Sequence, residues 1–194
     1  AADSGEMWLV LYNKDGTCRA ETRPIRVEAC EYMEGGGKCV SSDVSDSVVF
    51  FVKGLRAPKD GFVLAVRDAQ RLLYPGQEAS FRLPDGEWSR ILALGAAKEV
   101  RAGYEIVKVF EDYRLVFSRG PGLRYRQVIG PFVFDSESHP PTIEWAGDLD
   151  QDGHLDFLIE KSRFNHVEWD LYLSSKARSP ALLELVASLQ HSGC

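Results

Sequence analysis

The stretch TIEWAGDLDQDGHLDFLIEKSRFNHVEWDLYLSS, residues 142–175, holds the most informative pattern in this 194-residue chain. Short apolar runs flank an Asp-rich loop, and another apolar run follows at residues 169–173. Short runs rich in β-branched and aromatic residues, separated by a turn that contains Gly, predict strands rather than helices. This end of the chain is therefore predicted to form a strand–loop–strand hairpin with a returning third strand.

The loop between the first two predicted strands has acidic residues at alternate positions. Oxygen ligands at such spacing suit calcium, a hard cation that takes six to eight of them, and Gly153 stands where the chain must turn sharply. We predict one calcium ion, held by Asp148, Asp150, Asp152, the backbone carbonyl of His154, and Asp156. The alternative is an acidic loop that is merely solvated.

This loop is not an EF-hand, because Ile159 stands where an EF-hand has a bidentate Glu. The flanking segments are also strand-like rather than helical. Calcium whose coordination is filled by protein ligands leaves no position for a substrate. We therefore expect a structural clamp rather than a catalytic centre.

Turn-forming pairs such as Asp15-Gly16 and Pro75-Gly76 recur along the whole chain, with short β-branched and aromatic runs between them. This predicts a mostly-β fold of short antiparallel strands with few short helices. Tyr113, Leu115 and Phe117 should share one face of a strand. The predicted strands are residues 7–12, 48–52, 62–67, 104–110, 113–117 and a strand marked by Phe132 and Phe134, with a hairpin at Glu111-Asp112.

Short helices are predicted at residues 68–74 and 91–100, whereas residues 180–190 fit either a helix or a strand. The prolines after His139 favour extended backbone and suggest a boundary there. We expect a β-rich region at residues 1–139 and a calcium-loop hairpin region at 140–194, packed together as one globular unit.

The four cysteines indicate an oxidising compartment. None forms a Cys-x-x-Cys pair, so zinc or thioredoxin-like chemistry has little support. Cys30 and Cys39 flank a triple glycine and are predicted to pair, which leaves Cys18 with Cys194. The first residue is Ala1, as signal-peptide removal would leave, although a trimmed chain would look the same. We expect a secreted, periplasmic protein; the alternative is a cytosolic protein with four buried thiols.

Charge narrows the choice of partner. The net charge of −6 disfavours nucleic acid and anionic membranes, and no apolar run reaches the ~20 residues needed to span a bilayer. Residues 127–160 hold eight acids and no Lys or Arg, which favours a bound cation or a basic partner. These acids are Asp135, Glu137, Glu144, Asp148, Asp150, Asp152, Asp156 and Glu160.

Catalytic motifs are missing from the sequence. It contains no nucleophile elbow, zinc-protease motif or phosphate-binding Gly-rich loop. Residues 135–139 include the residue types of a catalytic triad, but neighbours in sequence seldom form one. The prediction is therefore a protein that is not an enzyme.

Residues 147–175, with their strand–loop–strand setting, resemble the calcium loops of FG-GAP-type repeats, which implies the same five loop ligands. The single loop does not supply the several blades of a propeller. The stretch from Gly147 to Cys194, with LYLSS at 171–175, resembles small periplasmic proteins of Gram-negative bacteria. The whole chain is similar to type VI secretion immunity proteins that neutralise a phospholipase D effector in Pseudomonas.

The resemblance implies a protein that binds a secreted phospholipase-type toxin and blocks its active-site entrance. Asp135, Glu137 and Glu144 would then face a basic head-group pocket on the toxin. One alternative is a calcium-dependent module that binds carbohydrate or the cell envelope, with Trp145 or Trp169 exposed beside the metal. A hydrolase with an unrecognised site is the third hypothesis.

Overall fold

The predicted mostly-β class is confirmed by the structure, a computed structural model in which strands make up 65% of the chain and helical turns 2%. Its only described helical segment is the 3-10 turn η1 (Pro121–Leu123). Within the described ranges, no helix has both the length and the apolar character needed to cross a membrane. The structure describes residues 3–29, 38–44, 47–61, 63–66, 69, 71–84, 86–102, 104–130, 132, 139–163 and 166–192.

Two compact units make up the chain. The N-terminal unit comprises the residues up to 64 together with 149–151, and the second unit comprises 65–148 and 152–192. The division therefore does not fall at the boundary expected near residue 140. Strand β11 (His139–Asp148) starts there and pairs with β6 (Arg71–Leu72), which keeps both sides of residue 140 in the second unit.

The N-terminal unit is a four-stranded antiparallel sheet in the order β3-β2-β1-β4. Asp15 and Gly16, both with positive φ, form the tight turn between β1 and β2. The strands predicted at residues 7–12 and 48–52 are confirmed. The four strands are β1 (Met7–Lys14), β2 (Thr17–Ala29), β3 (Lys38–Ser42) and β4 (Ser47–Val52).

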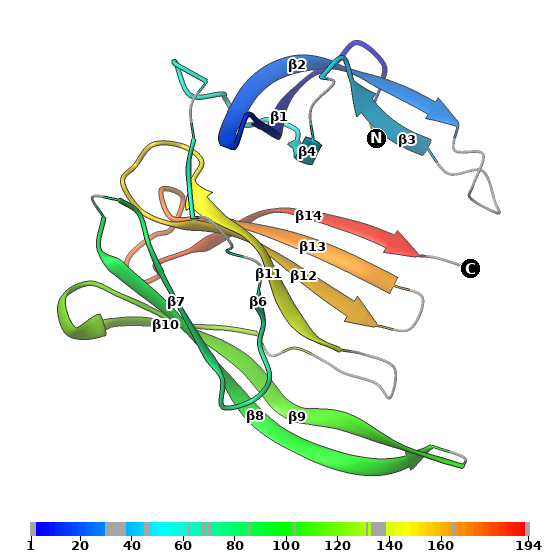
Figure 1. Cartoon of the computed structure of the whole chain (residues 1–194), viewed down its shortest axis with the longest axis vertical. Helices are drawn as coiled ribbons and strands as arrows, with labels where there is room; N and C mark the ends of the chain where they lie inside the picture. Colours follow the sequence, from blue (N-terminus) through cyan, green and yellow to red (C-terminus); the bar gives the residue numbers. More distant parts are fainter. Residues whose placement is uncertain are drawn as a thin grey trace. The chain divides into compact units, whose positions relative to one another are not determined.

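The second unit contains two sheets, which lie face to face (Figure 1). One has the order β10-β9-β8-β7; the other has the order β14-β13-β12-β11-β5, with β6 also paired to β11. The strands of the first sheet are β7 (Glu78–Arg82), β8 (Trp88–Ala102), β9 (Glu105–Arg119) and β10 (Tyr125–Ile129). The remaining strands are β5 (Leu64–Ala65), β12 (Asp156–Arg163), β13 (His166–Leu173) and β14 (Glu184–Ser192).

An aromatic core joins these two sheets. The ring of Phe157 on β12 makes edge-to-face contacts with Phe81 and Phe117, at centroid distances of 5.5 and 5.3 Å. Tyr113, Leu115 and Phe117 are 0% exposed, so the prediction that they share a buried face of one strand is confirmed. Alternation on β9 therefore directs large side chains into the core.

The two predicted helices are wrong. Residues 91–100 lie within β8, where Ile91 and Ala93 are buried and Leu94 is exposed, the alternation of a strand. The Ala, Leu and Glu there have helix propensity, but pairing with β9, and with β7 as far as Leu92, overrides it. In residues 68–74 the described part contains only the short strand β6. Residues 180–190, which fit either structure, enter β14 from Glu184.

The hairpin predicted at Glu111-Asp112 is also wrong, because β9 runs through it as one strand. Opposite this point the register of β8 shifts between Leu94 and Ala96, and Asp112 has φ 51°. This is a β-bulge, in which Gly95 opposes the extra residue. The true hairpin connects Ala102 to Glu105.

Two further strand predictions are corrected in part. Of residues 62–67, only Leu64 and Ala65 form a strand, β5, and residues 62 and 67 lie outside the described ranges. Phe132 is not in a strand, and its ring instead contacts Tyr113 at a centroid distance of 5.8 Å. Phe134 is outside the described residues.

The structure describes two of the four cysteines, Cys18 and Cys39. Cys39 is disulfide-bonded, and it lies on β3 opposite Glu28, two residues before Cys30 in the sequence. Cys30 and Cys194 are outside the described residues. Cys18 is buried on β2. Pairing of Cys30 with Cys39 and of Cys18 with Cys194 therefore stays a prediction.

Candidate metal centre

The Asp-rich loop connects two paired strands. Asp148 is the last residue of β11 and Asp156 the first of β12, and Gly147 lies directly opposite Asp156 in the antiparallel ladder. This register brings the two carboxylates to the same end of the sheet. Both are buried, at 4% and 0% exposed. A buried carboxylate is costly unless hydrogen bonds or a cation compensate its charge.

Three carboxylates converge in this loop. One oxygen each of Asp148, Asp150 and Asp156 lies within 4.8 Å of the others. Asp150 is more exposed than the other two. Three charges at this spacing repel one another strongly where water is scarce, and a divalent cation among them would reverse that repulsion. These three residues could hold a metal ion.

Backbone amides fix the direction of the two buried carboxylates. The N–H groups of Asp152 and Gly153 donate to the two oxygens of Asp148, at 3.0 and 2.9 Å. The N–H of Ser174, after β13, donates to Oδ1 of Asp156 at 2.8 Å. Each carboxylate oxygen can accept more than one bond, so these contacts orient the groups without using up their capacity for a metal.

Asp152, also a predicted ligand, points elsewhere in this structure. Its Oδ1 accepts the N–H of His154 at 2.8 Å, and its Oδ2 accepts the Ser174 hydroxyl at 2.7 Å. The carboxylate therefore braces the loop against the chain after β13. The structure brings together the carboxylates of Asp148, Asp150 and Asp156 and leaves that of Asp152 outside the cluster, whereas the carbonyl of His154 as a ligand stays a prediction.

The residues predicted to face a partner are mostly outside the described ranges. Asp135 and Glu137 are among them, whereas Glu144 is half-buried on β11. Trp145 is only 6% exposed, and Trp169 is half-buried. Trp145 therefore offers no open ring for stacking beside the metal loop.

Sequence reasoning missed a second polar cluster in the same sheet. Nζ of Lys161 on β12 lies 2.9 Å from Glu168 and 2.6 Å from Asp170, both on β13. Burial would raise the pKa of Glu168, yet hydrogen bonds from Lys161 and Ser188 hold that pKa below its usual range. The alternation of Glu168 and Asp170 with Val167, Trp169 and Leu171 was the available sign.

Searches for a related protein returned nothing: no family model, no curated protein and no solved structure matches this chain.

Proposed function

We propose that this chain is a non-catalytic periplasmic protein that binds a secreted phospholipase-type toxin and blocks its active-site entrance. The observation that carries the proposal is a projecting hairpin arm, defined here as residues 98–109 of β8 and β9. In this proposal the arm reaches into the toxin, and the rest of the second unit is the scaffold that holds the arm.

The arm has no third strand beside it in the described part of the chain. Pairing of β7 with β8 stops at Leu92, and pairing of β10 with β9 stops at Leu115. Farther out, Lys98 to Ala102 pair only with β9, and the two strands extend past their sheet (Figure 1). A lone two-stranded hairpin is marginally stable in water, so a partner that covers it would stabilise it.

Exposed side chains on the arm suit a protein partner. Tyr104, next to the hairpin turn, is 100% exposed, and Val100 is exposed as well. The ion pair between Lys98 and Glu111 is itself exposed and contributes little to stability. Tyr is enriched at the energetic centres of interfaces, because it buries a large area at little entropic cost.

A calcium ion at Asp148, Asp150 and Asp156 belongs to the same proposal as a structural clamp. Backbone amides already orient the two buried carboxylates, which favours a structural ion over a catalytic ion with an open coordination position. Asp152 and the His154 carbonyl would complete the shell after a local rearrangement. Calcium is supported here by the all-oxygen donor set, which is its preferred chemistry.

The periplasmic location is supported by the disulfide at Cys39, because such bonds persist in oxidising compartments. The carbohydrate-binding alternative expects an exposed aromatic ring beside the metal. Trp145 is buried and Trp169 is half-buried, so neither is the fully exposed ring that this alternative expects.

The test is inhibition of phospholipid hydrolysis by a toxin encoded beside this protein's gene. An equimolar amount of the chain should suppress hydrolysis and form a stable complex. Tyr104→Ala should weaken binding about 30-fold if the ring is an interface anchor. Tyr125→Ala is the matched control, since Tyr125 is exposed on β10 outside the arm. If the toxin is neither bound nor inhibited, the proposal is wrong.

A further inference from the structure

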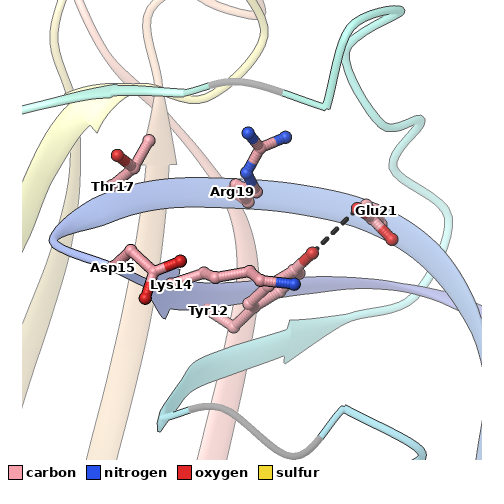
Figure 2. Close-up of a pocket in the computed structure, with 6 residues that line it drawn as sticks. All are labelled: Tyr12, Lys14, Asp15, Thr17, Arg19 and Glu21. Carbon is pink, nitrogen blue, oxygen red and sulfur yellow. Dashed lines mark hydrogen bonds between the residues drawn. The ribbon is translucent and has the colours of Figure 1, made fainter.

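A small cavity in the N-terminal unit lies over the β1–β2 hairpin, with a volume of about 200 Å³. This is below the ~300 Å³ at which pockets begin to enclose drug-sized molecules, so its occupant is small. Polar and charged side chains surround it (Figure 2). The lining residues are Tyr12, Lys14, Asp15, Thr17, Arg19 and Glu21.

Strand register explains why these side chains meet. Tyr12 lies opposite Arg19, and Lys14 opposite Thr17, in the antiparallel ladder of β1 and β2. Directly opposed residues point to the same face of a sheet, as does every second residue along a strand. The four side chains are therefore gathered on one face, close to the turn that begins at Asp15.

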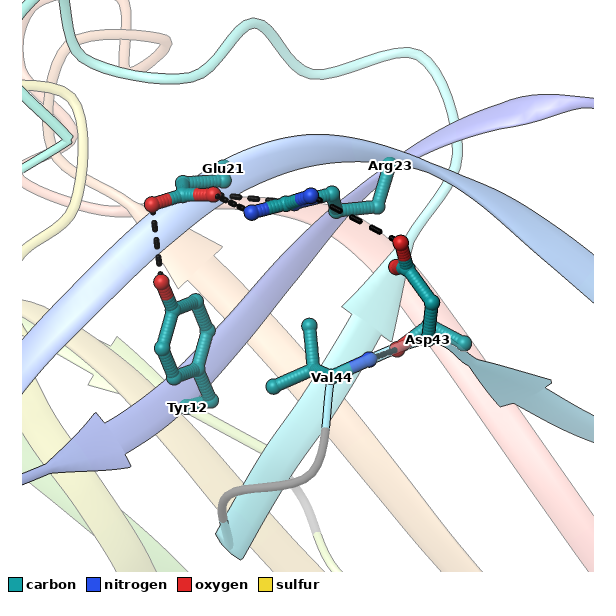
Figure 3. Close-up of polar contacts among 6 residues, drawn as sticks. Tyr12, Glu21, Arg23, Asp43 and Val44 are labelled. Atoms are coloured by element: carbon teal, nitrogen blue, oxygen red, sulfur yellow. Dashed lines mark hydrogen bonds and ion pairs between the residues drawn. The ribbon is translucent and has the colours of Figure 1, made fainter.

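Glu21, one of the two acids in the lining, is already committed to other partners. The Tyr12 hydroxyl donates to its Oε1 at 2.8 Å, and Arg23 holds its Oε2 while also reaching Asp43 at 3.6 Å (Figure 3). The hydrogen bond from Tyr12, and then that from Arg23, lower the pKa of Glu21 against the opposing effect of partial burial. Both oxygens of Glu21 therefore already accept hydrogen bonds, and Arg23 is shared between Glu21 and Asp43.

The two basic side chains of the lining, Lys14 and Arg19, differ from Glu21 in their contacts. The side chains of Lys14 and Arg19 make no hydrogen bond or ion pair with the described residues, although the charge of Arg19 contributes to the lowered pKa of Glu21. Asp15 is the one remaining acid. The lining thus holds two bases and two acids, and the acid Glu21 already accepts hydrogen bonds from Tyr12 and Arg23, whereas the donors of Lys14, Arg19 and the Thr17 hydroxyl face the cavity.

We propose that this cavity binds a small oxyanion, a phosphate or a phosphate monoester. Arg19 offers a planar fork of donors that matches two phosphate oxygens, Lys14 adds a second positive charge, and Thr17 adds a hydroxyl donor. The carboxylate of Asp15 repels an anion that has no hydrogen-bond donor. It therefore favours a phosphate monoester whose organic group carries a hydroxyl. The inference does not depend on the toxin proposal.

Calorimetric titration and ¹H–¹⁵N spectra of the intact chain test this inference. The probes are sodium phosphate, glycerol 3-phosphate, and phosphatidylcholine vesicles with and without phosphatidic acid. Saturable binding of a soluble probe with a Kd below about 10 mM supports a soluble ligand. Binding only to the vesicles with phosphatidic acid supports a lipid head group. Binding to none of them overturns the proposal.

Variants separate this site from general charge attraction. Arg19→Gln should weaken binding about tenfold or more, as expected for a charged hydrogen bond, and Lys14→Gln should weaken it less. Arg26→Gln is the matched control, because it removes the same charge from an exposed position of β2. Equal affinity in Arg19→Gln and Arg26→Gln would overturn the proposal. Unchanged circular dichroism establishes that each variant is folded.

Discussion

Nζ of Lys161 lies 2.6 Å from Oδ2 of Asp170, a carboxylate that is 1% exposed. The same ammonium lies 2.9 Å from Glu168, and the Ser188 hydroxyl is within hydrogen-bonding distance of both acids. This cluster sits on the sheet face that also carries the core residue Ile159, directly opposite Asp170. A single cation therefore compensates two poorly solvated carboxylates.

Lys161→Met should destabilise the second unit by about 3 kcal/mol, because it leaves the buried carboxylate of Asp170 and the half-buried one of Glu168 without a cation. Urea denaturation followed by circular dichroism measures the change. Addition of Asp170→Asn and Glu168→Gln to this variant should restore part of the loss, since the uncompensated charges are then gone.

Lys98→Met is the control for the Lys161 variant. Its ion pair with Glu111 is 60% exposed on both sides, so the expected loss is below about 0.5 kcal/mol. Equal stability of both single variants would show that water, not Lys161, compensates Asp170.

The acid stability of the N-terminal unit should depend on Glu6. Hydrogen bonds from Lys53 and Trp8 lower the pKa of Glu6 from 4.5 to about 2. A folded-state pKa below the unfolded one stabilises the fold above the unfolded pKa, and this contribution is lost as pH falls through the folded one. Glu6→Gln should therefore be less stable than the parent above pH 4.5 and converge with it near pH 2.

Urea midpoints measured across this pH range test the Glu6 prediction. Glu28→Gln is the control, because the Glu28 side chain is exposed on β2 and makes no hydrogen bond or ion pair with the described residues. A constant difference between Glu6→Gln and the parent at every pH would contradict the linkage.

The bulge in β8 should require glycine at position 95. Gly95 has φ 142°, and a Cβ there would lie 3.0 Å from the Glu111 carbonyl oxygen and 3.1 Å from the Tyr113 Cα. Backbone atoms cannot move aside cheaply. Gly95→Ala should destabilise the protein by about 1–3 kcal/mol, measured as a fall in the urea midpoint.

Gly122→Ala is the control that distinguishes the close contact at Gly95 from the cost of a positive φ alone. Gly122 also has positive φ, but a Cβ there would meet nothing within 4 Å. Its variant should lose less stability than Gly95→Ala. The reverse order would mean that the close approach at the bulge is not what selects glycine.

Much of the fold was predictable because period-two alternation is local. Tyr113, Leu115 and Phe117 alternate with less apolar residues, and all three are buried on one face. The local sequence pattern could not distinguish a hairpin turn from a β-bulge. The polar pair Glu111-Asp112 suits both, and only Gly95, sixteen residues earlier, reveals that the strand continues.

The metal loop was predicted in part for a similar reason. Spacing indicated that Asp148, Asp150 and Asp156 could converge, and they do. The position of Asp152 depends on the Ser174 hydroxyl, which arrives from 22 residues farther along the chain. The spacing of residues within the loop cannot predict a contact with a residue so far along the chain.

Disulfide mapping should link Cys39 to Cys30. Cys39 is disulfide-bonded, and its strand β3 is antiparallel to β2, which ends just before Cys30. Proteolysis without reductant followed by mass spectrometry identifies the linked peptides, and the same digest tests the pairing of Cys18 with Cys194. Cys39→Ser should cost about 3 kcal/mol, because a short closed loop constrains the unfolded chain. A Cys39 peptide linked to Cys194 would contradict this pairing.

The calcium clamp is the central claim made for the Asp-rich loop, and direct titration tests it. Isothermal titration of the intact chain should show one calcium ion bound per chain, with a Kd of about 10⁻⁴–10⁻³ M or tighter. Saturating calcium should also raise the melting temperature. Asp150→Asn should abolish both effects, whereas Glu184→Gln, at an exposed position of β14, should keep them. No binding heat, together with the same melting temperature in calcium and in chelator, would contradict the account.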